Sequence, residues 1–186
     1  MIKIHKSTLP FHSTIAKYLP VDYHDTFSCT TNNLKNITPD DIMVAFWTTM
    51  SQWVSILFKI RHLLVKPFGL KTGKDEDFKQ RELAIRNGID HGLMSVVEKK
   101  DNETIISLDD KHLKAYISVY IEENKDIYLT TLVKFHNKLG FTYFYMICPF
   151  HIIVVKSIGQ PHQNFSSGQL ACVIIIVYLS VIFLYI

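Results

Sequence analysis

The chain has 186 residues, a formal net charge of +3 and three cysteines. This length suffices for one domain with a hydrophobic core and is too short for two domains of ordinary size. Basic residues are mixed with acidic ones rather than gathered in a patch, so the sequence lacks the usual signature of nucleic-acid binding. The cysteines are widely spaced and form no CxxC motif, which argues against a disulfide framework.

The first predicted element is a strand at residues 22–31 (DYHDTFSCTT), a stretch rich in aromatic and β-branched residues. Residues 38–41 (TPDD) are typical of a helix start. Threonine caps free amides, proline suits the first helical position, and two aspartates complement the helix dipole.

Apolar residues then recur every three or four positions as far as Leu64, which predicts a helical stripe facing a core. Thr48, Thr49 and Ser51 are poor helix formers inside this long run. We therefore expect two consecutive short helices rather than one.

Period-two patterns follow. Residues 91–98 and 103–108 flank a polar turn and predict a hairpin. In the predicted strands 112–122 and 126–136 the odd-numbered residues are apolar, with Thr131 as the exception. The alternation indicates that each strand has one buried face, and the short polar connection between them favours antiparallel neighbours.

Asn137 stands where a helix N-cap belongs, and residues 138–158 predict a long apolar helix that Pro149 should bend or break. The order is therefore a strand, two helices, a series of antiparallel strands and a closing helix. We predict an α+β domain with the helix-grip arrangement, in which the long C-terminal helix covers the apolar side of a curved antiparallel sheet.

Four segments resemble, as a set, the bacterial family known as domain of unknown function 2867. They are RHLLVKPFGLKTG at 61–73, ISLDDKHLKAYISVYI at 106–121, TTLVKFHNKLG at 130–140 and YFYMICPFHIIVVKSI at 143–158. The resemblance spans about residues 20–155. It implies a fold similar to the START and Bet v 1-like proteins and implies no established chemistry. The seven glycines include no GxG pattern, so we expect no dinucleotide cofactor.

Asp110 and His112 are a candidate acid and base, because residues two apart on a strand share a face. Their parity, however, places them with Lys114 on the side opposite the apolar row, and His136 lies on that side too. The competing interpretation is that Asp110 shapes a turn, His112 lies at the rim or surface, and Asn137 caps the closing helix beside His136. A β-bulge would reverse the parity.

Two further candidate ligand-binding residues lie on the helical stretch. Trp53 belongs to the apolar stripe, which favours core packing. Arg61 directly follows the stripe residue Ile60 and can pair with a buried carboxylate or a ligand anion or extend to water. The nine histidines form no HxH, HxxxH or HExxH motif, so we expect no metal site. We assign no catalytic residue.

The chain ends with an uncharged apolar segment that begins at Leu170 and ends at Ile186. We divide the chain into a domain at 8–160, a polar linker at 161–169 and this tail at 170–186, a possible transmembrane anchor of borderline length. The N-terminal residues have no run of signal-peptide length, so we expect the domain on the cytoplasmic side. The tail can instead pack on the domain or be a chance extension.

These features lead to one functional hypothesis and two alternatives. We expect a domain that binds a small apolar molecule or lipid and is tethered to a membrane. One alternative is an enzyme of the same fold that acts on a small cyclic substrate with Asp110 and His112. The other is an interaction domain with a filled core and no ligand.

Overall fold

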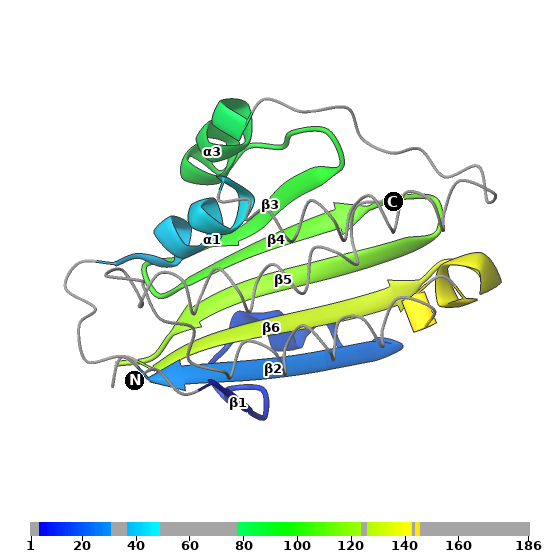
Figure 1. Ribbon diagram of the computed structural model, residues 1–186, viewed down its shortest axis with the longest axis horizontal. Helices are drawn as coiled ribbons and strands as arrows, with labels where there is room; N and C mark the ends of the chain where they lie inside the picture. The colour runs from blue at the N-terminus through cyan, green and yellow to red at the C-terminus, as the bar shows by residue number, and fades with distance from the viewer. Residues whose placement is uncertain (1–3, 31–36, 49–77, 124–125, 143, 146–186) are drawn as a thin grey trace, which may run out of the picture.

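The computed structural model describes residues 4–30, 37–48, 78–123, 126–142 and 144–145. Over these residues the protein has an α+β architecture built on one six-stranded antiparallel sheet with a few short helices (Figure 1). The elements are β1 Ile4–Lys6, the 3-10 helix η1 Thr14–Tyr18, β2 Tyr23–Thr30, α1 Pro39–Thr48, α3 Phe78–Asn87, β3 Met94–Lys99, β4 Glu103–Asp109, β5 Leu113–Ile121 and β6 Asp126–Phe135.

The sheet has the strand order β1-β2-β6-β5-β4-β3, and every neighbouring pair is antiparallel. Strands β3 to β6 follow one another as a meander, because short turns join them. Strand β2 pairs with β6 along its whole length, from Tyr23 opposite Val133 to Thr30 opposite Asp126. This long-range pairing brings the first half of the chain into the sheet.

We call one side of the sheet the apolar face. It is formed by the odd-numbered residues of β5 and β6 and their cross-strand neighbours on β2, β3 and β4. The odd residues Ala115, Ile117, Val119, Leu129 and Val133 are all buried in one hydrophobic cluster. The predicted alternation is therefore confirmed.

Helix α1 lies on the apolar face, where the strands it contacts most are β5 and β4, and α3 packs against α1 and contributes Ala84 and Ile85 to the same hydrophobic cluster. Helix α1 begins as its sequence predicts. The hydroxyl of Thr38 accepts a hydrogen bond from the amide of Asp41, and the carboxylate of Asp41 accepts one from the amide of Thr38. This reciprocal pair satisfies two of the free amides at the helix start.

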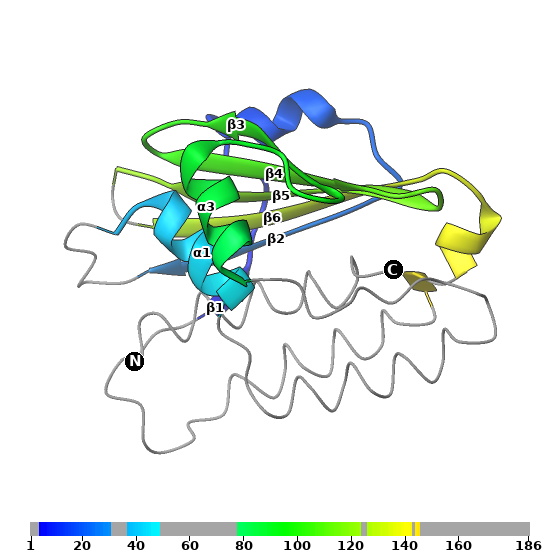
Figure 2. The same cartoon turned by 90° about the horizontal axis from the view of Figure 1, so that it is seen from above.

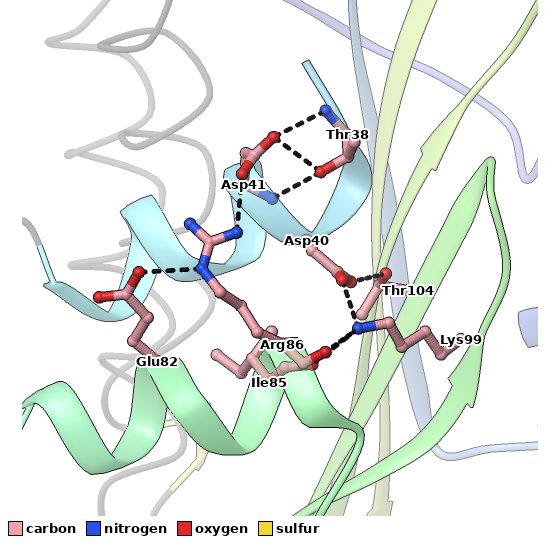
Figure 3. Close-up of polar contacts among 8 residues, drawn as sticks. All are labelled: Thr38, Asp40, Asp41, Glu82, Ile85, Arg86, Lys99 and Thr104. Carbon is pink, nitrogen blue, oxygen red and sulfur yellow. Dashed lines mark hydrogen bonds and ion pairs between the residues drawn. The ribbon is translucent and has the colours of Figure 1, made fainter. Parts of the chain in front are cut away.

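Charged side chains fix both helices to the hairpin of β3 and β4 (Figure 3). Lys99 contacts the carboxylate of Asp40 at 2.6 Å and donates to the carbonyl oxygens of Ile85 and Arg86 at the end of α3. The cation thus complements the negative end of the α3 dipole. Asp40 also accepts a hydrogen bond of 2.6 Å from Thr104 on β4.

The other side of the sheet, which we call the second face, is also covered, and the expectation of one buried face per strand is wrong there. Figure 2 shows η1 on the opposite side of the sheet from α1. Ile15 of η1 forms a cluster with Ile105 and Leu132, and the ring of Tyr18 stacks on Tyr116 with centroids 4.1 Å apart. Alternation within a strand cannot reveal such a cover, because the apolar side chains that provide it come from another segment.

A buried carboxylate fastens this N-terminal cover. Glu103 is 1% exposed, and its Oε1 accepts hydrogen bonds of 2.6 Å from the hydroxyls of Ser13 and Ser118. Its Oε2 accepts a bond of 2.6 Å from the amide of Thr14. A carboxylate is costly to bury unless donors surround it, and here the donors come from both the cover and β5.

The strand predictions at 22–31, 91–98, 103–108, 112–122 and 126–136 are confirmed as β2, β3, β4, β5 and β6 with small shifts of their ends. We did not predict β1, η1 or α3. Helix α3 is mostly polar in sequence, so its short apolar face was not recognised. The second predicted helix, most of the helix at 138–158 and all of residues 161–186 lie outside the described residues. Within the described ranges, no helix is long and apolar enough to cross a membrane.

The Glu103 contacts generate a prediction about stability. Glu103→Ala leaves the hydroxyls of Ser13 and Ser118 and the amide of Thr14 without their acceptor in the interior. We expect the free energy of unfolding to fall by about 3 kcal/mol, measured by chemical denaturation. Glu123→Ala, at an exposed position, serves as the control and should change it by less than about 0.5 kcal/mol. Equal stability of the two variants would contradict the role of Glu103.

Candidate functional site

Two segments that carry the family resemblance meet at one end of the sheet. Asp109 is the last residue of β4, the turn to β5 holds Asp110 and His112, and the end of β6 leads into His136 and Asn137. They adjoin because β5 pairs with both β4 and β6, and the amide of His136 donates to the carbonyl of His112 at 2.9 Å. We call these five residues the corner. It lies at the right-hand end of the sheet in Figure 1, where β6 meets the yellow helical turns.

Asp110 holds the shape of the turn. Its Oδ1 accepts hydrogen bonds from the backbone amides of His112 at 2.6 Å and Leu113 at 2.8 Å. A short polar side chain that bonds amides two and three residues later is a common turn device. This carboxylate oxygen therefore contacts the backbone rather than the imidazole ring of His112.

Asn137 caps the helix that follows β6, as its position in the sequence predicts. Its Oδ1 accepts a hydrogen bond of 3.0 Å from the amide of Gly140, and residues 138–142 and 144–145 are helical. Its Nδ2 donates to the carbonyl of Lys111 at 2.9 Å and lies 3.3 Å from Nδ1 of His112. One side chain thus joins the helix start to the β4–β5 turn.

The amide of Asn137 also assigns a tautomer to the His112 ring. Oδ1 of Asn137 accepts from the Gly140 amide. Nδ2 of Asn137 lies closer to Nδ1 of His112 than Oδ1 does, at 3.3 Å against 3.5 Å, and can donate a hydrogen bond to it. This orientation of the amide assigns Nδ1 as the acceptor and the ring proton to Nε2.

His112 is buried, with 9% of its surface exposed, so the interpretation of a surface or rim residue is wrong. Its Nε2 makes no hydrogen bond within the described part of the chain. A buried N–H group without an acceptor costs about 1–3 kcal/mol. The corner therefore holds a donor that can bind an acceptor oxygen.

Gly140 allows the helix to approach this turn. A Cβ atom at Gly140 would lie 2.2 Å from the carbonyl oxygen of His112, a distance that no side chain tolerates. Glycine is therefore required by the close contact between helix and turn rather than by an unusual backbone angle.

His136 and Asp109 lie at the outer side of the corner. Asp109 Oδ1 is 2.9 Å from Nε2 of His136, and Oδ2 is 2.8 Å from Nζ of Lys114. Partial burial favours the neutral acid, but these donors from Lys114 and His136 outweigh it and lower the pKa of Asp109. The side chains are substantially exposed, so the ion pairs contribute little to stability.

A second group of polar residues lies on the apolar face itself, and the sequence did not reveal it. Asp25 and Thr131 face each other across β2 and β6, in line with Ile117 on β5. Asp25 is 5% exposed and Thr131 4% exposed, and the hydroxyl of Tyr23 donates to Oδ2 of Asp25 at 2.9 Å. We call Tyr23, Asp25 and Thr131 the buried polar cluster. The interruption of the odd-numbered apolar row at Thr131 was its signal, but the register that adds Asp25 was unknown.

The other candidates can be placed only in part. Trp53 and Arg61 lie outside the described residues. Among the residues that the structure describes, no group of three or more His, Cys, Asp or Glu side chains is arranged to hold a metal ion.

The assignment of the His112 ring can be tested by nitrogen NMR of the labelled protein. We expect a protonated Nε2 and an unprotonated Nδ1. In Asn137→Asp a carboxylate oxygen replaces Nδ2 and accepts rather than donates, so the proton should move to Nδ1. Lys138→Ala, one residue along, should leave the ring unchanged. A wild-type ring protonated on Nδ1 would contradict the assignment.

Comparison with known proteins gives the family. A sequence model of the family described as "Protein of unknown function (DUF2867)" matches residues 17–158, which is more than half of the chain and includes both the corner and the buried polar cluster. No curated protein and no solved structure matches the chain. The resemblance noted in the sequence is thereby confirmed, and the chain belongs to the DUF2867 family of proteins of unknown function.

Proposed function

We propose that this domain binds a small, largely apolar molecule between the apolar face and the C-terminal helix. The observation that carries the proposal is the buried polar cluster of Tyr23, Asp25 and Thr131 within a face that is lined mainly by apolar side chains. Sites for small molecules combine an apolar wall with a few polar groups that fix the ligand's orientation.

The helix-grip arrangement is part of this proposal. The helical turns after Asn137 begin at the end of β6, and Phe144 on these turns is 1% exposed. The Phe144 ring packs against Tyr23 and Phe135, with centroids 4.7 and 5.2 Å away. These contacts support a helix that sets out along the apolar face, which is the position that the helix-grip fold requires.

The position of the cluster also supports a ligand site. Helix α1 packs mainly on β4 and β5, whereas Asp25 and Thr131 belong to β2 and β6. Phe144 reaches the near end of β2 at Tyr23, and Asp25 lies two residues further along that strand. Asp25 and Thr131 thus lie between the strands that α1 contacts and the end of β2 that Phe144 contacts.

Fold analogy alone does not establish function. One experiment separates a ligand-binding domain from an interaction domain without a ligand. Native mass spectrometry of the full chain purified from cells should show an added small-molecule mass. An interaction domain with a filled core would give only the mass of the chain, and that result would overturn the proposal. Attachment to the inner side of a membrane through residues 170–186 stays a prediction.

A pair of variants connects the added mass to the apolar face. Thr131→Val removes a hydroxyl from the cluster at nearly constant volume, and we expect the bound fraction to fall at least about threefold. Thr130→Val makes the same change one residue away on the second face, where Thr130 contacts Thr26, and should leave the bound fraction unchanged. Equal retention by the two variants would place the ligand elsewhere.

A further inference from the structure

We infer that His112 is a ligand-binding residue whose Nε2–H group donates a hydrogen bond to an uncharged carbonyl oxygen of the ligand, as in a ketone or an ester. The ligand is the molecule proposed to lie between the apolar face and the C-terminal helix. This inference therefore rests on the proposed function and specifies the chemical class of its ligand.

The Nε2 atom of His112 carries the inference. Asn137 contacts the other ring nitrogen, Nδ1, and the tautomer assigned above puts the proton on Nε2. Nε2 is buried and makes no hydrogen bond within the described part of the chain. Most buried polar groups in native proteins have a partner, and leaving a donor without one is unfavourable. A bound molecule that supplies an acceptor oxygen would remove this cost.

The helix after Asn137 places this donor at one end of the proposed ligand site. Gly140 and Phe144 lie four residues apart and so share a side of the helix, and Phe144 is buried in the core cluster of the apolar face. A Cβ atom at Gly140 would lie 3.5 Å from the Cβ atom of His112. Leu113, the next residue along the chain, belongs to the same core cluster. His112 therefore adjoins the side of the helix that faces the sheet.

The orientation of the ring directs Nε2 into the protein. The two nitrogens lie on different sides of an imidazole, so Nε2 points away from the Asn137 amide that Nδ1 contacts. Because Nε2 is covered, a ligand oxygen reaches it by displacing the groups that now cover it. Binding should therefore change the surroundings of Nε2 directly, and nitrogen NMR of the ring can detect this change.

The charges around His112 favour an uncharged acceptor. Oδ1 of Asp110 accepts a hydrogen bond of 2.6 Å from the backbone amide of His112, so a carboxylate already lies beside this residue. Lys111, between the two, is exposed to water, which screens its charge. A ligand carboxylate would meet the like charge of Asp110, whereas the carbonyl of a ketone or an ester accepts the hydrogen bond without bringing a charge.

Two probes of similar length separate a hydrogen-bonded ligand from one held by apolar contacts alone. They are 2-octanone, whose oxygen accepts hydrogen bonds, and 1-chloroheptane, whose chlorine is a very weak acceptor. Each is titrated into the full chain, freed of copurified ligand and labelled with nitrogen-15 in its histidines. We expect 2-octanone to shift the Nε2 resonance of His112 more than the Nδ1 resonance, and 1-chloroheptane to shift Nε2 less than 2-octanone does.

Variants connect the affinity to the donor. His112→Phe keeps a ring and removes the Nε2–H group, so the affinity for 2-octanone should fall at least about fivefold relative to that for 1-chloroheptane, measured by calorimetry. His112→Gln retains an amide donor on its side chain and should recover part of the difference. The control is His24→Phe, the same change at an exposed position opposite Leu132 on the second face, which should keep the wild-type affinities.

The possible results distinguish a failure of this inference from a failure of the proposed function. If neither probe binds the wild-type protein, the proposed function itself is contradicted. If both bind while 2-octanone leaves the Nε2 resonance unchanged, or if His112→Phe keeps the wild-type ratio of affinities, the domain binds apolar molecules but His112 does not bind their oxygen. If His112→Phe does not fold, the titration of the wild-type ring decides.

Discussion

The pairing of β2 with β6 is the contact on which the rest of the arrangement depends. The two strands are about a hundred residues apart in sequence, and their register sets Tyr23, Asp25 and Phe27 opposite Val133, Thr131 and Leu129. Because side chains alternate between the faces of a strand, a slip by one residue would move Asp25 to the other side of the sheet. The register therefore decides that a carboxylate belongs to the apolar face.

Each face of the sheet has a buried carboxylate, Glu103 on the second face and Asp25 on the apolar face, and their surroundings differ. Glu103 is held by two hydroxyls and an amide that join the N-terminal cover to the strands, an arrangement that serves stability. Asp25 adjoins Tyr23 and Thr131 between the contacts of α1 and Phe144. At the corner, Asn137 links the helix start to the β4–β5 turn and leaves the buried Nε2 of His112 as a donor.

The sequence predicted the strands and helix starts that depend on a local residue pattern. Odd-numbered apolar residues located β5 and β6, the TPDD segment located the start of α1, and Asn137 located the start of the helix that follows β6. It did not predict what depends on distant partners. The cover of the second face comes from η1, which has no periodic signal, and Asp25 was one polar residue in a strand until its register with Thr131 was known. His112 was expected at the rim or surface, yet it is buried in the turn before β5, beside Asn137 and Gly140.

The proposed ligand occupies the apolar face beside Asp25. Methyl NMR of the protein titrated with decanol tests it most directly, because methyl groups report on both faces at once. The account predicts shifts at Ile117, Leu129 and Val133 on the apolar face, with Ile15, Ile105 and Leu132 on the second face unchanged. Shifts confined to the second-face methyl groups, or no shift at a concentration that saturates binding, would contradict it.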